Sequence, residues 1–216
     1  MKVLRKSCAQ GAKEAEGLAV IIDVFRAFSC APLFFHFGAD RVIMEADPAR
    51  AISLKRDNPE SILVGEVNEV PIEGADVGNS PTHIIQKGAP YFRHRTVIHR
   101  TTAGVTGATA AFGHAEEVVL GSFVTAKAIA AYIREKRPGR VTLVAMGERA
   151  ERPAPEDEAC ADYLEHLLTG TSYDPVRPSA RWSCSPRPRN FSRGPQAISP
   201  VKTPSSVSSG TSSILS

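Results

Sequence analysis

Strand-like and helix-like segments alternate along the first 170 residues, and this alternation constrains the fold more than any other feature. Short runs rich in branched apolar residues are typical of buried strands, as in LAVIID (18–23), RVIMEA (41–46), SILVGE (61–66) and RVTLVAMG (140–147). Stretches of helical spacing follow them, for example PARAISLKRDN (48–58), which has proline in its first turn. The pattern predicts an α/β fold, a three-layer α/β/α sandwich around a mostly parallel or mixed sheet.

The composition changes abruptly after Gly170. Residues 171–216 are dominated by Ser, Pro and Arg and show no strand or helix period. Such a segment has too little apolar surface to offset the entropy lost on ordering. We therefore predict a folded domain over residues 1–170 and a disordered tail over residues 171–216. The alternative is that a change of reading frame replaced the end of the domain, which would leave the sheet one or two elements short.

Composition excludes several classes of function. With 42% hydrophobic residues, 23% charged residues and a net charge of +3, the chain is typical of a globular protein without nucleic acid as its main partner. No apolar run reaches the roughly 20 residues that span a bilayer, and no hydrophobic stretch follows the basic N-terminus. The four cysteines form no Cys-x-x-Cys pair, so we expect neither zinc nor disulfides, and a cytoplasmic location. The oligomeric state stays open, with a homo-oligomer as one alternative.

Carboxylates lie where an α/β sheet binds its ligands, beyond the carboxyl ends of the strands. Asp23 and Glu66 each end a predicted strand, and Glu156 and Asp157 begin the last predicted helix. Carboxylate oxygens are hard ligands, and Mg²⁺ commonly uses one or two of them while keeping waters for a substrate phosphate. These four residues are therefore the candidate metal ligands. Asp23 and Glu66 are also the candidates for the general base.

Candidate anion-binding groups lie at the same edge. Three predicted helices begin there, and free backbone N–H groups at a helix start attract anions. Arginines add bidentate contacts to such anions. The candidate substrate-binding residues are Arg26, Ser29, Asn79, Ser80, Arg100, Thr101, Thr102 and Gly104. Metal-assisted attack on a phosphate ester is one reaction that would use all of these groups.

Each of these features also has a purely structural interpretation. Acids at a helix start compensate the helix dipole, and Asn79 with Ser80 can be an ordinary cap and turn. Arg26 can neutralise Asp23. The six histidines show no metal-ligand spacing, so we expect structural or surface roles for them. Composition and spacing alone therefore predict an α/β domain that binds an anion.

Five segments, taken in order, resemble the 2-phosphosulfolactate phosphatase family. They are IIDVFRAFS, VGEVNEVPIEGADVGNSPTHI, RTTAGVTGA, GSFVTAKAIA and EDEACADYL, and they run from about residue 18 to residue 168. The resemblance implies a three-layer α/β/α fold and a magnesium-dependent acid phosphatase. Its substrate would be 2-phosphosulfolactate, a small anionic phosphate ester on a route to coenzyme M. Asp23 would then hold magnesium at the end of its strand, and Arg26 would hold an anion beside it.

The chain departs from the family pattern at several positions. Phe28 stands where Thr is frequent, Ala103 where Asn is frequent, Val105 where Thr is frequent, and Thr125 where the family has Asn. These changes remove hydroxyl and amide groups from the predicted loops. Two hypotheses follow: a magnesium-dependent phosphatase, or a non-catalytic anion-binding relative inactivated by the departures and an aberrant C-terminus.

Overall fold

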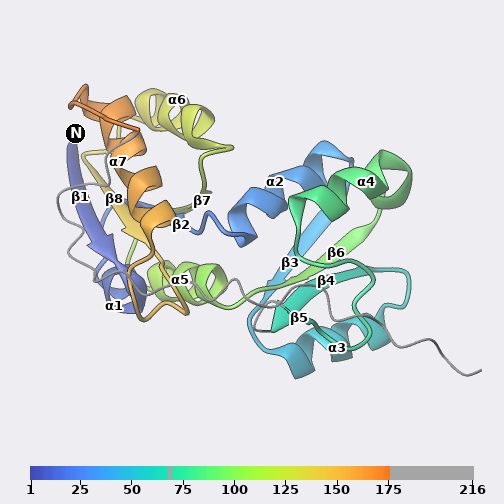
Figure 1. The fold of residues 1–216 in the computed structure, drawn as a ribbon. Coiled ribbons are helices and arrows are strands. Elements are labelled where there is room, and N and C mark those ends of the chain that lie inside the picture. The colour runs from blue at the N-terminus through green and yellow to red at the C-terminus, as the bar shows by residue number, and fades with distance from the viewer. Residues whose placement is uncertain (68–69, 176–216) are drawn as a thin grey trace, which may run out of the picture. The chain divides into compact units, whose positions relative to one another are not determined.

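The structure, a computed structural model, describes residues 1–67 and 70–175, in which two four-stranded sheets are flanked by helices (Figure 1). In chain order the elements are β1 (Lys2–Ser7), α1 (Cys8–Lys13), β2 (Leu18–Ile22), α2 (Ala27–His36), β3 (Arg41–Glu45), α3 (Pro48–Asp57), β4 (Ile62–Val67), β5 (Val70–Pro71), α4 (Pro81–Phe92), β6 (Thr96–Arg100), α5 (Ala103–Phe112), β7 (Glu117–Gly121), α6 (Ala126–Lys136), β8 (Arg140–Ala145) and α7 (Pro155–Thr169).

The first sheet is entirely parallel, with the strand order β1-β8-β2-β7. All five residues of β2 are buried, as expected for a central strand covered on both faces. Ile22 at the end of β2 pairs in register with Gly121 of β7 and Ala145 of β8. The loops that follow these three strands therefore leave the sheet at one edge.

Side chains of β2 alternate between two apolar clusters, one on each face of the first sheet. Leu18, Val20 and Ile22 pack with residues of α6 and α7, whereas Ala19 and Ile21 pack with residues of α1 and α5. This alternation follows from the two-residue period of a strand. Helices thus cover both faces, and the predicted α/β sandwich is confirmed.

The second sheet has the order β3-β6-β4-β5, in which only β5 runs antiparallel to its neighbour. One face packs on α2 and α4 through Phe34, Ile84 and Phe92, and the other face packs on α3 through Ala51. The sequence pattern predicts β3, β4 and β6, but neither the two-residue strand β5 nor the division of the strands between two sheets. Pairing partners depend on long-range contacts, which hydrophobic periodicity does not encode.

Two elements at the N-terminus were not predicted. Strand β1 has only two apolar residues, Val3 and Leu4, and helix α1 is a six-residue run of mostly small or polar residues. Both gain their structure from the tertiary fold, because β1 pairs with β8 along its whole length. A short edge strand of this composition gives little periodic signal.

The domain boundary at residue 170 stays a prediction. Helix α7 ends at Thr169, and Gly170 follows in the left-handed conformation with φ 76°. Most of the predicted tail, residues 176–216, lies outside the described residues. No helix in the described part of the chain is long and apolar enough to cross a membrane.

Helix α5 packs tightly against the first sheet at Gly107. A Cβ atom there would lie 2.2 Å from Met146 Sδ and 3.0 Å from Ile21 Cγ2, and both residues are fully buried. We predict that Gly107→Ala lowers the free energy of unfolding by about 1 kcal/mol or more, since overpacking outweighs the better helix propensity of Ala. Urea denaturation measures the change. Gly113→Ala is the matched control: its nearest such contact is 4.0 Å away, so a similar loss there would contradict the steric explanation.

Candidate active site

Asp23 follows β2 directly, and its buried carboxylate joins the starts of two helices. Its Oδ1 accepts a hydrogen bond from Ala27 N at 3.2 Å, and its Oδ2 accepts one from Gly104 N at 2.9 Å. Ala27 begins α2 and Gly104 lies in the first turn of α5. Neither helix is capped by the side chain of its own N-cap residue, Arg26 or Thr102. Asp23 therefore serves as a shared cap for helices 76 positions apart in sequence, counted from Ala27 to Ala103.

Asp157 has the same arrangement from the opposite end of the chain. It lies in the first turn of α7, where the sequence predicts it, and its side chain is buried. Its Oδ1 accepts from Val24 N and its Oδ2 accepts from Gly147 N, both at 2.7 Å. Because Val24 adjoins Asp23, the two carboxylates belong to one polar cluster at the carboxyl edge of the first sheet.

Burial shifts the ionisation of both acids in the same direction. It raises the pKa of Asp23 to about 6, against the opposing effect of the two backbone hydrogen bonds, and the charges of Glu156 and Glu66 raise it further. It also raises the pKa of Asp157 to about 7, with the charge of Asp23 as the next cause. At neutral pH the cluster thus holds negative charge that its surroundings solvate poorly.

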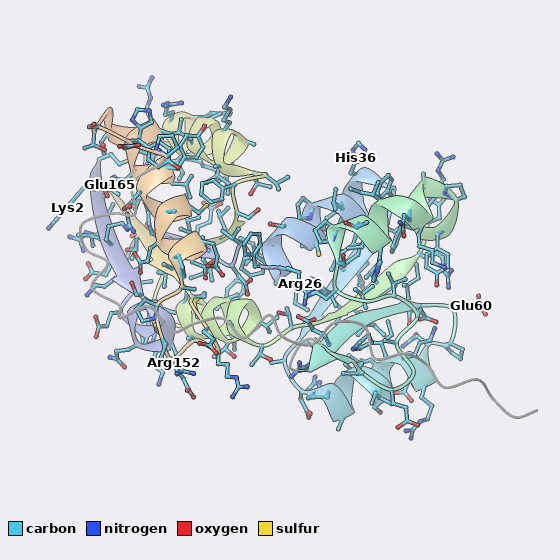
Figure 2. All side chains as sticks on the ribbon, in the orientation of Figure 1. Lys2, Arg26, His36, Glu60, Arg152 and Glu165 are labelled. Carbon is cyan, nitrogen blue, oxygen red and sulfur yellow. The ribbon has the colours of Figure 1, made fainter. Side chains whose placement is uncertain are left out.

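Glu66 lies at the end of β4 and forms an ion pair with Arg26. Arg26 is the residue that precedes α2 (Figure 2). Arg100, at the end of β6, donates from Nη1 to the backbone oxygen of Glu66. Gly65 allows this approach, because a Cβ atom there would lie 2.7 Å from Arg100 Cβ. The structure therefore brings Arg26, Glu66 and Arg100 together, with the charges of Arg26 and Glu66 already paired and Arg100 bonded to the backbone of Glu66.

Arg100 itself is held in an unusual environment. Its side chain is largely buried, and its Nε has no hydrogen-bond partner among the described residues. Burial lowers the pKa of its guanidinium, although the charge of Glu66 opposes the shift. The unused Nε is itself buried, so it is an unsatisfied donor whose burial costs free energy.

The remaining predicted anion contacts have different surroundings. Ser29 Oγ donates to Val24 O at 2.7 Å, so this hydroxyl stabilises the turn between β2 and α2. Thr101 N donates to Glu45 O, and Thr102 is the N-cap of α5. Ser80 is the N-cap of α4, but its side chain makes no capping hydrogen bond. The N–H of Gly104 is bonded to Asp23 and is not free for an anion.

Two of the candidate metal ligands, Asp23 and Asp157, lie close enough together to be tested as a site for Mg²⁺. No group of three or more His, Cys, Asp or Glu side chains is placed to hold a metal ion within the described ranges. Asp23 and Asp157 nevertheless fit a cation that takes one or two carboxylates. Each of their oxygens accepts one backbone hydrogen bond, which leaves a second lone pair, and their buried charges raise the pKa of the cluster. The larger set with Glu66 and Glu156 stays a prediction.

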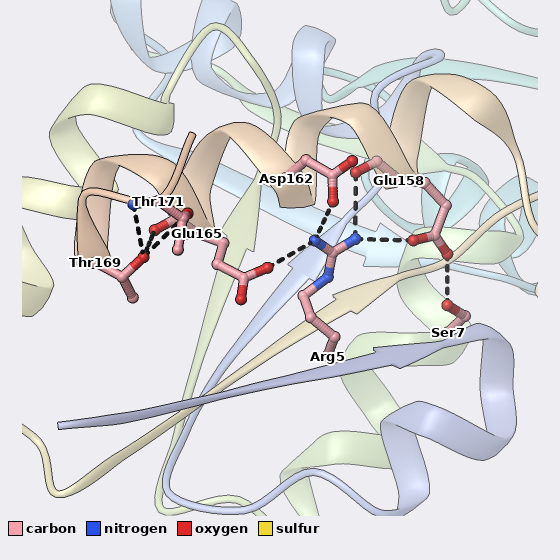
Figure 3. A network of polar contacts seen from close by, with 7 residues as sticks. All are labelled: Arg5, Ser7, Glu158, Asp162, Glu165, Thr169 and Thr171. Atoms are coloured by element: carbon pink, nitrogen blue, oxygen red, sulfur yellow. Dashed lines mark hydrogen bonds and ion pairs between the residues drawn. The ribbon is translucent and has the colours of Figure 1, made fainter. Parts of the chain in front are cut away.

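Arg5 is a residue that sequence analysis missed, and it fixes α7 to β1 (Figure 3). Its guanidinium pairs with Glu158 at 2.8 Å, Asp162 at 2.5 Å and Glu165 at 3.3 Å, on successive turns of α7. Ser7 Oγ donates to the other oxygen of Glu158 at 2.5 Å. The network holds the first turn of α7, which carries Asp157. No local sequence pattern predicts this network, because Arg5 and Glu158 are 153 positions apart.

A family model and the curated relatives that match this chain carry the same family name. Residues 5–183 match the family model described as 2-phosphosulpholactate phosphatase. Relatives named "Probable 2-phosphosulfolactate phosphatase" from Bacillus subtilis (strain 168), Caldanaerobacter subterraneus subsp. tengcongensis and Deinococcus radiodurans are 30%, 34% and 29% identical to this chain. The matches cover 71%, 58% and 70% of this chain. The chain spans 64%, 52% and 62% of the length of those relatives.

The Arg5 network makes a clear prediction for stability. Arg5→Met keeps the length of the side chain but leaves three partly buried acids unpaired along α7. We expect the free energy of unfolding to fall by about 3 kcal/mol, measured by chemical denaturation. Lys6→Met is the control on the same strand, since the Lys6–Glu14 pair is more exposed and should contribute about 0–1 kcal/mol. Equal losses for the two variants would contradict a special role for Arg5.

The raised pKa values of Asp23 and Asp157 predict how stability depends on pH. In the unfolded chain an Asp titrates with a pKa of about 3.9, so between pH 8 and 6.5 these two acids take up protons only in the folded state. Buried His99, whose pKa is lowered to about 4, opposes them, because in the unfolded chain its imidazole begins to take up a proton in the same window. The two acids outweigh it, so stability of the metal-free protein should rise as the pH falls from 8 to 6.5, by roughly 0.5 kcal/mol.

Thermal unfolding in EDTA at pH 8.0 and 6.5 measures this dependence. Asp157→Asn should be less stable at both values and should lose most of the difference between them, because the amide does not titrate. A wild-type stability that falls from pH 8.0 to 6.5 would contradict the assignment.

Proposed function

We propose, from the premise that this chain belongs to the 2-phosphosulfolactate phosphatase family, that it hydrolyses a small anionic phosphate monoester. The single observation that carries the proposal is the buried pair Asp23 and Asp157 at the carboxyl edge of the first sheet. Their carboxylates are close enough for the charge of one to raise the pKa of the other. Burial of like charges is costly in a structural site but useful where a cation or proton is to be bound.

Magnesium is the cofactor that we propose for this site. Asp23 and Asp157 would hold it, with Glu156 and Glu66 near enough to raise the pKa of Asp23 by their charge. When bound, the ion would neutralise negative charge on the carboxylates and the phosphate and act as a Lewis acid. Its binding would compete with protonation of the two acids, so affinity should increase with pH between about 6 and 7.

The chain's own residues supply anion binding. Arg26 and Arg100 would contact the anionic groups of the substrate, which requires Arg26 to exchange its ion pair with Glu66 for one with the ligand. Asn79 and Ser80 would contact an anion at the start of α4, where the backbone N–H groups and the helix dipole favour negative charge. The proposed substrate, 2-phosphosulfolactate, carries three anionic groups, which matches several separate cationic or N–H-donating positions.

A general base is available within the same cluster. The pKa of Asp23, raised to about 6, lies near neutral pH, where a base is both deprotonated and able to accept a proton. Glu66, released from Arg26 when substrate binds, is the alternative. In either case the residue would accept the proton of the attacking water, and the buried position would limit competing access of solvent.

The proposed setting is the cytoplasm, on a route to coenzyme M. Cys8, Cys30 and Cys160 are free thiols, which fits a reducing compartment. The second candidate is a non-catalytic anion-binding relative. One observation favours it: both oxygens of Asp23 already accept backbone hydrogen bonds, and Glu66 is already paired.

Phosphate release separates these two candidates. We expect the wild type to release phosphate from 2-phosphosulfolactate, and more slowly from other small monoesters, in Mg²⁺ but not in EDTA. Asp23→Asn should lower kcat/KM at least about a hundredfold, because it removes a charge at the reacting centre while keeping one acceptor. Circular dichroism checks that each variant folds, and Glu135→Gln, on the exposed face of α6, is the control. A folded wild type without turnover would favour the anion-binding relative.

A further inference from the structure

His99 is a buried side chain without a role in the proposed reaction. It lies in β6 one residue before Arg100, has no solvent exposure, and packs edge-on against Phe34 with ring centroids 5.2 Å apart. Burial lowers the pKa of its imidazole to about 4, so the ring is neutral at physiological pH. A neutral imidazole has one N–H donor and one bare nitrogen acceptor.

The hydrogen bond to Asn79 decides which nitrogen carries the proton. His99 Nε2 lies 2.9 Å from Asn79 Oδ1, and an amide oxygen can only accept. The proton is therefore on Nε2, and Nδ1 is the bare acceptor. Nδ1 is buried without a hydrogen-bond partner in the described part of the chain. The ring thus uses its single donor on Asn79.

This bond fixes the amide of Asn79 in one orientation. With Oδ1 directed to His99, the amide nitrogen Nδ2 faces away from the ring, and it donates no hydrogen bond to any described residue. Asn79 is only 3% exposed, so it has little freedom to rotate. An oriented, unused amide donor is suited to an anionic acceptor.

The strand register places this donor at the proposed anion site. His99 pairs with Val64 and Arg100 with Gly65, while Val77 forms a parallel bridge to Val64. The segment that carries Asn79 therefore leaves beside the carboxyl ends of β4 and β6. It leads directly into α4 through Ser80, whose side chain makes no capping hydrogen bond.

We infer that His99 is a positioning residue, whose Nε2–H holds the Asn79 amide so that its Nδ2 donates to an anion bound at the start of α4. This inference rests on the proposed function, which assigns Asn79 to anion binding. It extends that function by naming a residue that does not touch the ligand. His99 orients the Asn79 amide as a neutral ring with its proton on Nε2, so no change of its charge is needed.

Two variants separate the donor from the ring. His99→Phe keeps the aromatic contact with Phe34 but removes the N–H donor, whereas His99→Gln loses the ring but keeps an amide N–H. We expect His99→Phe to weaken binding of inorganic phosphate about tenfold and to raise KM more than it lowers kcat. His99→Gln should recover most of the affinity. His114→Gln, at an exposed histidine in the turn after α5, is the control and should bind as the wild type does.

Nuclear magnetic resonance of the ¹⁵N-labelled protein provides the readout. Titration with phosphate should shift the side-chain amide signals of Asn79 in the wild type. The imidazole spectrum of the wild type should show the Nε2–H form of His99, a result that does not depend on whether any variant folds. An Nδ1–H form, an unresponsive Asn79, or unchanged phosphate affinity in a folded His99→Phe would each overturn the inference. Failure of the proposed function looks different: Asn79 responds to phosphate, but the wild type releases none from the esters.

Discussion

Two buried carboxylates hold the carboxyl edge of the first sheet together. Asp23 and Asp157 accept four backbone hydrogen bonds, from Ala27, Gly104, Val24 and Gly147. These donors belong to the segments that follow β2, β6 and β8. Segments far apart in the chain therefore donate hydrogen bonds to the same two side chains. Hydrogen bonds to charged groups contribute about 1.5–3 kcal/mol each, which offsets part of the cost of burying the acids. The geometry of the edge depends on these acids being present and at least partly ionised.

The same arrangement creates the charge imbalance on which the proposed chemistry rests. Within the described residues, the two arginines proposed to bind the anion, Arg26 and Arg100, contact Glu66 rather than Asp23 or Asp157. Asp23 and Asp157 are therefore stabilised by backbone N–H groups and not by these cations, and their pKa values rise. A proton or a cation relieves the imbalance, and either one competes with the other. A purely structural pair would gain more from a neighbouring arginine, as Glu158 does from Arg5.

Sequence reasoning reached the local parts of this design but not the long-range ones. The apolar run before Asp23 predicts a strand end, and the acidic pair Glu156 and Asp157 predicts a helix start; both are observed. Five blocks in the order of the family then identify the chain. What the sequence could not predict are partners chosen by the fold: the separation into two sheets, the pairing of β1 with β8, and the contact of Arg5 with α7. Each joins residues whose proximity depends on the complete topology.

The environment of His99 is a further long-range feature that the sequence does not predict. The sequence predicts only structural or surface roles for the six histidines, and the structure buries His99 completely. Its link to Asn79 spans 20 positions and two connections, so the strand pattern alone gives no sign of it. The informative signal would have been a titratable residue next to Arg100 in an otherwise apolar strand, because a buried polar group needs a partner.

The departures from the family pattern acquire a physical meaning in this context. Phe28 is buried, and its ring lies so close to Gly104 that a Cβ atom there would be 2.6 Å from its Cζ. Gly104 in turn uses its N–H on Asp23. The start of α5 is therefore filled by packing and capping, and neither residue 28 nor Gly104 has a donor left for a ligand. In the proposed function, anion binding would then depend on Arg26, Arg100 and the Asn79–Ser80 segment. The proposed orientation of the Asn79 amide would therefore matter more here than the family pattern alone suggests.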